Sequence, residues 1–149
     1  TGVDKMKDIF CFCCACVSSA ILYLVGDITM PFIILLIFMC TDYITGLILS
    51  GVFKKSKKTE SGGLSSEIGF KGLIKKVCII ICVIVANMLD YVLKTNYIRN
   101  VVIISFITNE VISIIENLGL IGVKIPKVIT NAIDILKGKE EDENAKIGD

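Results

Sequence analysis

The chain has 149 residues, of which 54% are hydrophobic and 21% are charged, and its formal net charge is +1. Soluble domains are roughly 45–50% apolar, so a mean hydropathy of +0.76 means that the excess apolar surface must contact lipid. The chain contains no His, which removes the commonest general base and metal ligand. The near-neutral charge argues against nucleic acid as a partner.

Four apolar stretches predict four transmembrane helices. They are residues 9–25, 31–53, 77–93 and 101–121. Each reaches the length of a spanning helix, which is about 20 residues with a range of roughly 17–25. The last stretch is one of the more polar, and its alternative is an amphipathic helix lying in the membrane interface. The predicted fold class is therefore all-α, an integral membrane helical bundle in one domain.

The connections between these stretches differ in length and charge. Residues 26–30 form a predicted tight turn, with Pro31 tolerated in the first turn of the next helix, so the first two helices are expected to make an antiparallel hairpin. Residues 54–76 form a long basic loop, whose second half is compatible with an interfacial lead-in to the third helix. Residues 127–137 predict a short cytoplasmic amphipathic helix, and residues 138–149 a charged, disordered tail.

The distribution of Lys and Arg predicts the orientation, because cytoplasmic segments carry an excess of both. Two lie in the first eight residues, seven in the basic loop and five after residue 121, against two in the other two connections together. Both termini and the basic loop are therefore expected in the cytoplasm, where the loop attracts anionic lipid. The lysines of this membrane-surface loop are Lys54, Lys55, Lys57, Lys58, Lys71, Lys75 and Lys76.

Four acids lie within the predicted spans. An acid at mid-membrane costs on the order of 2.5–3.5 kcal/mol on insertion scales, so these side chains are expected to face other helices, water or the interface. Asp90 lies four residues before Lys94, an i,i+4 pair, and Glu116 lies within reach of cytoplasmic lysines. Asp42 and Glu110 are deep and have no obvious partner, so the protonated form is expected for both where water is absent.

Polar and small residues accompany these acids at helical spacing. Each of the last three spans therefore has one polar or small face. Ordinary helix packing is the alternative for such faces, since small residues let helices approach and polar residues bond across them. One chain has too few helices to enclose a wide pore, so a pore built from these faces requires several copies. The candidate pore or subunit-interface residues are Asp42, Thr45, Gly46, Ser50, Asn87, Asp90, Ser105, Asn109, Glu110, Ser113, Glu116 and Asn117.

The seven Cys residues are interpreted as small hydrophobic side chains. Four of them fall in the run CFCCAC at residues 11–16, which has no accompanying His and, within lipid, no aqueous route for a metal ion. The sequence also has no Gly-rich phosphate loop, and without His no nucleophile–base pair can be drawn. We therefore expect no catalytic residue, no cofactor and no metal site.

Several motifs follow one another between about residue 40 and residue 137. They are Asp42-x-x-Thr45-Gly46, then Gly69-x-x-Gly72-Leu73-x-Lys75-Lys76, then Asp90, then Asn109-Glu110-x-x-Ser113-Ile114-x-Glu116-Asn117, and finally Gly122-x-x-Ile125-Pro126 with a charged tail. This order resembles the toxin-secretion/phage-lysis holin family, small multi-span proteins of phages of Gram-positive bacteria. The family includes relatives associated with export of large clostridial toxins. The block that begins at Asn109 is the most specific part of the resemblance.

The resemblance implies a function that the residues alone leave open. Holins accumulate in the bacterial cytoplasmic membrane, oligomerise and open it at a set time, which lets an endolysin reach the wall or a folded toxin leave. The implied partners are the lipid bilayer, further copies of the chain and, functionally, an endolysin or toxin. The residues also allow a small oligomeric ion or proton channel that uses Asp42 and Glu110, or a non-conducting assembly subunit of a membrane complex.

Overall fold

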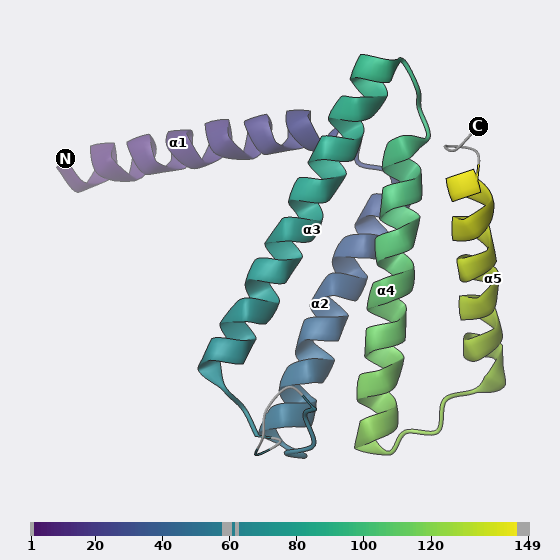
Figure 1. Ribbon diagram of the computed structural model, residues 1–149. Helices are drawn as coiled ribbons and strands as arrows, with labels where there is room; N and C mark the ends of the chain where they lie inside the picture. Colours follow the sequence, from purple (N-terminus) through teal and green to yellow (C-terminus); the bar gives the residue numbers. More distant parts are fainter. Residues whose placement is uncertain (1, 58–60, 62, 146–149) are drawn as a thin grey trace.

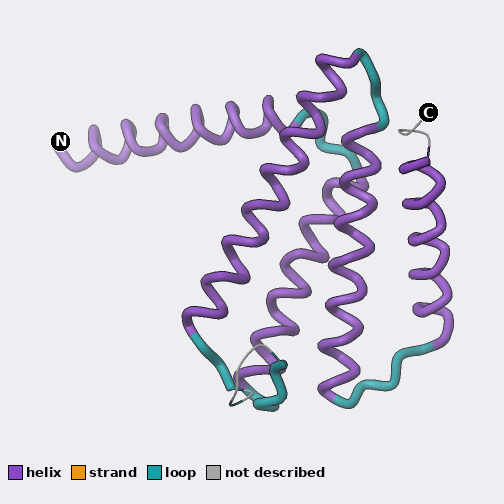
Figure 2. The backbone as a smooth tube through the Cα atoms, viewed as in Figure 1, coloured by secondary structure: helices purple, strands orange, loops and turns teal. Residues whose placement is uncertain are grey.

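The computed structural model describes residues 2–57, 61 and 63–145, and each regular element in this part of the chain is an α-helix (Figures 1 and 2). The helices are α1 (Gly2–Val25), α2 (Met30–Gly51), α3 (Ser66–Leu93), α4 (Ile98–Ile121) and α5 (Lys127–Ala145). α1, α2, α3 and α4 are long and apolar enough to cross a membrane. The predicted all-α membrane fold is confirmed.

Helices α2, α3 and α4 form the packed centre of the molecule, and α2 makes its most extensive contact with α4. Each helix contributes one fully buried side chain to the core, namely Leu35, Val83 and Ile103. The apolar core includes Ile79 and Ile107 as well. Lipid is as apolar as these side chains, so close packing rather than transfer from water holds the helices together in a membrane.

The predicted antiparallel hairpin of the first two helices is wrong. α1 leaves the three-helix unit at the turn before α2 and runs away from it (Figure 1), and its contacts with other helices are made with α3. The Asn87 side chain of α3 donates a hydrogen bond to the main-chain oxygen of Leu24 at 3.0 Å. Gly26 turns the chain with φ of +83°, a left-handed conformation that suits glycine. The last turn of α1 is therefore fixed against α3.

The basic loop is shorter than predicted because α3 begins at Ser66. Glu67 in the first turn complements the positive end of the helix dipole and pairs with Lys71 at 2.6 Å. Lysines that were assigned to the loop but lie on this helix are Lys71, Lys75 and Lys76. Lysines that remain exposed in the loop are Lys54, Lys55 and Lys57, whereas Lys58 lies outside the described residues.

The C-terminal helix is longer than predicted. α5 runs to Ala145, so the expected disorder from residue 138 is wrong as far as that residue, and residues 146–149 lie outside the described part. The helix lies beside α4 (Figure 1) and buries Ile133. Its later turns carry a run of Lys and acidic residues, and it is not one of the helices apolar enough to span a membrane.

Candidate functional site

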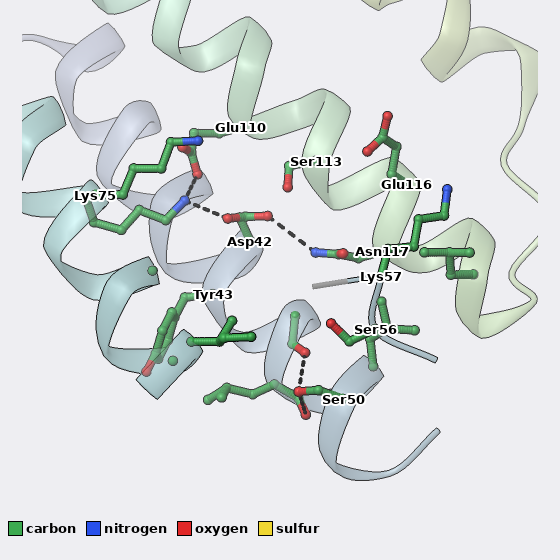
Figure 3. Close-up of a pocket in the computed structure, with 18 of the residues that line it drawn as sticks. Asp42, Tyr43, Ser50, Ser56, Lys57, Lys75, Glu110, Ser113, Glu116 and Asn117 are labelled. Carbon is green, nitrogen blue, oxygen red and sulfur yellow. Dashed lines mark hydrogen bonds and ion pairs between the residues drawn. The ribbon is translucent and has the colours of Figure 1, made fainter. Parts of the chain in front are cut away.

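Lys76 of α3 bridges two acids that belong to different helices. Its Nζ donates a hydrogen bond to Oδ2 of Asp42 at 2.6 Å and another to Oε2 of Glu110. The side chains of Lys76, Asp42 and Glu110 are 13%, 12% and 7% exposed. In Figure 3 dashed lines join one oxygen of Asp42 and one oxygen of Glu110 to the same lysine nitrogen. The prediction that Asp42 and Glu110 have no partner is therefore wrong.

Asn117 of α4 completes the hydrogen bonding of Asp42. Its Nδ2 donates to Oδ1 of Asp42 at 3.3 Å and to Oγ1 of Thr45 at 3.2 Å. The Thr45 hydroxyl in turn donates to the main-chain oxygen of Asp42 at 3.0 Å. Both carboxylate oxygens of Asp42 are thus occupied by groups from α3 and α4. We call Asp42, Thr45, Lys76, Glu110 and Asn117 the polar cluster.

A cavity of about 450 Å³ lies beside the polar cluster and is bounded by α2, α3, α4 and the loop before α3. Ser113 and Glu116 of α4 and Lys57 of the loop line it (Figure 3). Asn109 and Lys75 also line it, and both are exposed. The cavity extends from the deep ions to the basic loop, so it is a chamber with both polar and apolar lining residues that enters the bundle from one end.

The remaining candidates on α2 and α4 surround this chamber or lie outside it. Gly46 lines it, and a Cβ added at this position would make ordinary van der Waals contact with the Asn117 amide nitrogen at 3.8 Å. Ser50 lines it and donates its hydroxyl to the main-chain oxygen of Gly46 at 2.8 Å. Ser105 is half-buried and does not line the chamber. Glu116 has no ion pair with another described residue.

Asn87 and Asp90 are not part of this arrangement but lie at the opposite end of the bundle. Oδ1 of Asp90 accepts hydrogen bonds from the Thr95 hydroxyl at 2.6 Å and from the Ile98 N–H at 3.1 Å, and Oδ2 accepts one from the Arg99 N–H at 2.9 Å. Asp90 therefore caps the first turn of α4, whose N–H groups have no partner within the helix.

The expected ion pair between Asp90 and Lys94 is absent from the described residues. Lys94 instead ends α3 in a left-handed conformation with φ of 55°. This reversal of the backbone brings the start of α4 to the Asp90 carboxylate.

Besides Lys76, Arg99 is a residue whose structural role the sequence did not reveal. It is buried between the turn before α2 and the start of α4.

Comparison with known proteins decides the family. A model described as the bacteriophage holin family matches residues 19–138. The chain belongs to the bacteriophage holin family. The match includes α2, α3, α4 and the whole polar cluster, and the resemblance read from the sequence motifs is confirmed.

Individual relatives are consistent with this family. A probable holin of Bacillus phage phi105 is 32% identical over 114 residues, which is 76% of this chain and 78% of the relative. An uncharacterised Listeria innocua protein is 41% identical over 125 residues (83% and 84%), and an uncharacterised 14.9 kDa Clostridium perfringens protein is 37% identical over 120 residues (79% and 85%). No solved structure matches this holin-family chain.

Proposed function

We propose that this chain assembles as a homo-oligomer in the bacterial cytoplasmic membrane and opens lesions that release an endolysin or a toxin. The observation that carries the proposal is the polar cluster, which places three charged side chains inside a unit of membrane-length helices. Ions at membrane depth are costly, and they typically mark pathways or interfaces. Membership of the holin family supports the same function.

A single chain is closed by its own packing. The polar cluster and the chamber occupy the half of the unit nearer the basic loop, whereas the apolar core, including Leu35, Val83 and Ile103, fills the other half. Water that enters the chamber therefore meets an apolar seal. Passage of ions or proteins requires rearrangement of this seal or separation of the helices between neighbouring copies.

The exposed polar side chains of α4 favour assembly. Asn109 and Glu116 are exposed on a helix long and apolar enough to span the membrane. Both residues line the chamber, which is open to the surroundings of a single chain, and polar groups exposed at membrane depth are costly, so burial against a polar face of a second copy would lower that cost. Crowding of chains in the membrane would thus drive these faces together.

The proposed topology places the basic loop and both termini in the cytoplasm, with α1, α2, α3 and α4 crossing the membrane. Because α1 runs sideways from the end of the bundle opposite the basic loop in the structure (Figure 1), this topology requires α1 to change its direction relative to α2, α3 and α4. Three exposed lysines of the loop, Lys54, Lys55 and Lys57, then meet anionic lipid, at about 1 kcal/mol for each. The charged second half of α5 excludes this helix from hydrocarbon. Because α5 packs along α4 in the structure, we propose that α5 separates from α4 and lies at the cytoplasmic surface when α4 spans the bilayer.

Expression of the protein in a bacterium tests this function against the alternatives. Membrane potential and escape of a cytoplasmic enzyme are followed together after induction. Lesion formation gives abrupt depolarisation followed by leakage of the enzyme. An ion or proton channel, which the chamber and its acids favour as the second candidate, gives depolarisation without leakage. An assembly subunit gives neither signal.

Neutral substitution of the deep acids is expected to change the time at which lysis begins. Asp42→Asn and Glu110→Gln each remove one of the two ion pairs of Lys76, and a hydrogen bond to a charged group contributes about 1.5–3 kcal/mol. A looser unit opens sooner, so we expect earlier onset in a lysis-time assay at matched expression. Glu67→Gln, which alters an exposed pair on α3, is the control. Unchanged timing in both deep variants would contradict a role for these acids.

A further inference from the structure

The wall of the chamber that α4 forms carries a carboxylate oxygen that no described residue occupies. Oε2 of Glu110 accepts the hydrogen bond from Lys76, whereas Oε1 accepts none from a described residue. Glu110 is only 6% exposed and lines the chamber. Its Oε1 is not sealed from the chamber, because the fully enclosed unpaired side-chain atoms of the described residues are Thr29 Oγ1 and Arg99 Nε. A group inside the chamber therefore reaches this oxygen.

Ser113 adds a hydroxyl group to the same wall. It follows Glu110 by three residues on α4, so the two side chains lie on one face of the helix, and both line the chamber. In Figure 3 Ser113 lies between Glu110 and Glu116 along this wall. The Ser113 hydroxyl makes no hydrogen bond to another described residue. The wall thus presents a charged and a neutral oxygen, side by side on the helix, to whatever occupies the chamber.

Charge is distributed unevenly along the chamber. At its deep end Asp42, Lys76 and Glu110 together carry one net negative charge, and both oxygens of Asp42 are occupied by Lys76 and Asn117. The unpaired charge is therefore presented to the chamber by Glu110. The charged residues that line the chamber and are exposed form its rim and sum to one positive charge, namely Lys57, Lys75 and Glu116. The chamber has a negative interior and a positive rim.

We propose that the chamber binds a zwitterionic aminoethyl phosphate group, with the primary ammonium at Glu110 and Ser113 and the phosphate near the rim lysines. An ammonium group has three N–H donors and no acceptor, so it fits free acceptor oxygens beside an unpaired negative charge. Lysine binds phosphate as a point charge. The volume of about 450 Å³ lies within the range of small-ligand sites. An aminophospholipid headgroup and free phosphoethanolamine both carry this group.

The lining of the outer part of the chamber also suits a lipid. Leu47 and Leu64 line the chamber and are exposed, so they offer apolar surface next to the charged rim. In the proposed topology the basic loop lies in the cytoplasm, which places the mouth of the chamber at the level of the cytoplasmic headgroups. A headgroup enters the chamber from there while its acyl chains remain in the bilayer.

Binding to purified full-length protein in a neutral detergent tests the proposal. Native mass spectrometry and titration calorimetry are carried out with short-chain phosphatidylethanolamine, phosphatidylcholine and phosphatidylglycerol, and with phosphoethanolamine. We expect one saturable phosphatidylethanolamine site per chain, and roughly tenfold weaker binding of phosphatidylcholine, whose trimethylated nitrogen has no N–H donor. Phosphatidylglycerol, which has no ammonium, should bind no more tightly than phosphatidylcholine. Competition by phosphoethanolamine at similar concentration would identify the free headgroup as a sufficient ligand, and lack of competition would assign the lipid.

Two variants and one matched control locate the site. Glu110→Gln removes the unpaired charge, and we expect roughly tenfold weaker binding of phosphatidylethanolamine, as for loss of one charged hydrogen bond. Ser113→Ala removes the neutral acceptor and leaves the ion pairs of Lys76 in place, and we expect roughly threefold weaker binding. Ser105→Ala is the control, because Ser105 is half-buried on the same helix and does not line the chamber. This variant is expected to bind as the parent does.

The proposal is overturned if the parent protein binds no phosphatidylethanolamine, or binds all three lipids equally, because contact with acyl chains would then explain the binding. Parent-like binding by both the Glu110 and Ser113 variants, or equal weakening by Ser105→Ala, would also overturn it. Helical circular dichroism identifies loss of fold, and Ser113→Ala decides the outcome if Glu110→Gln does not fold. The inference rests on the topology in the proposed function but not on lesion formation, so a failure in lysis assays is distinguishable from a failure here.

Discussion

Replacement of Lys76 by Met is expected to lower the free energy of unfolding by about 3–5 kcal/mol. The substitution removes the cation shared by Asp42 and Glu110 and leaves two buried acids side by side without a counter-ion. Removal of one partner from a buried ion pair costs more than the pair contributes, because the remaining charge stays desolvated. Thermal unfolding of the purified protein in detergent, followed by circular dichroism, measures the loss.

A neighbouring lysine offers a close control for this prediction. Lys75 is the adjacent residue of α3, is exposed and makes no ion pair with a described residue, so Lys75→Met should change stability by less than about 0.5 kcal/mol. The triple variant Lys76→Met, Asp42→Asn, Glu110→Gln should recover much of the loss, since no unpaired charge remains. Equal effects of the two single lysine variants would show that the buried ion pairs do not matter.

Replacement of Asp90 by Ala is expected to lower the free energy of unfolding by roughly 2–3 kcal/mol, as for loss of a helix cap together with charge-assisted hydrogen bonds. The carboxylate holds the N–H groups of Ile98 and Arg99 and the Thr95 hydroxyl. Without it, the start of α4 frays and its contact with the end of α3 weakens. Faster hydrogen exchange at the Ile98 and Arg99 amides, together with a lower melting temperature, is the expected observation.

Asp90→Asn distinguishes the hydrogen bonds of the helix cap from the negative charge, because it keeps an acceptor oxygen and removes the charge. Its side-chain oxygen still accepts one or two of these hydrogen bonds, so about half of the loss is expected to be recovered. Lys94→Gln is the second control, because the structure gives Lys94 no ion pair with Asp90 or another described acid. A loss of stability in Lys94→Gln as large as that in Asp90→Ala would contradict the capping role and favour the i,i+4 pair.

The sequence contained a signal that places Lys76 on the buried face of α3 rather than in the basic loop. Lys76 precedes Ile79, Val83, Ala86 and Asp90 at alternating steps of three and four, and those four residues are the buried face of α3. The same spacing places Lys76 on that face, one turn before Ile79. Its charge and the lysines around it favoured a loop, whereas the apolar periodicity already extended the helix.

Other features depended on contacts between segments far apart in the chain. The turn at Gly26 could have returned α1 along α2, but in the structure the end of α1 contacts α3, and the hydrogen bond from Asn87 to Leu24 is one of these contacts. The Asp90 carboxylate was near both Lys94 and the start of α4 in sequence. Lys94 ends α3 in a left-handed conformation, which brings the start of α4 to the Asp90 carboxylate. Asp90 therefore caps α4 and does not pair with Lys94.

The sequence by itself predicted that the chain lies in lipid, that its elements are helices and that it resembles the holin family. These features could be predicted because length, hydropathy and helical periodicity are local properties of the chain. The sequence also identified Asp42, Glu110 and Asn117 as polar side chains that lipid would not accept. Only the tertiary structure decided that Lys76 joins the two acids and that Arg99 is buried at the other end. Those pairings depend on the rotation and depth at which helices pack, and side chains from separate helices meet only after that packing is fixed.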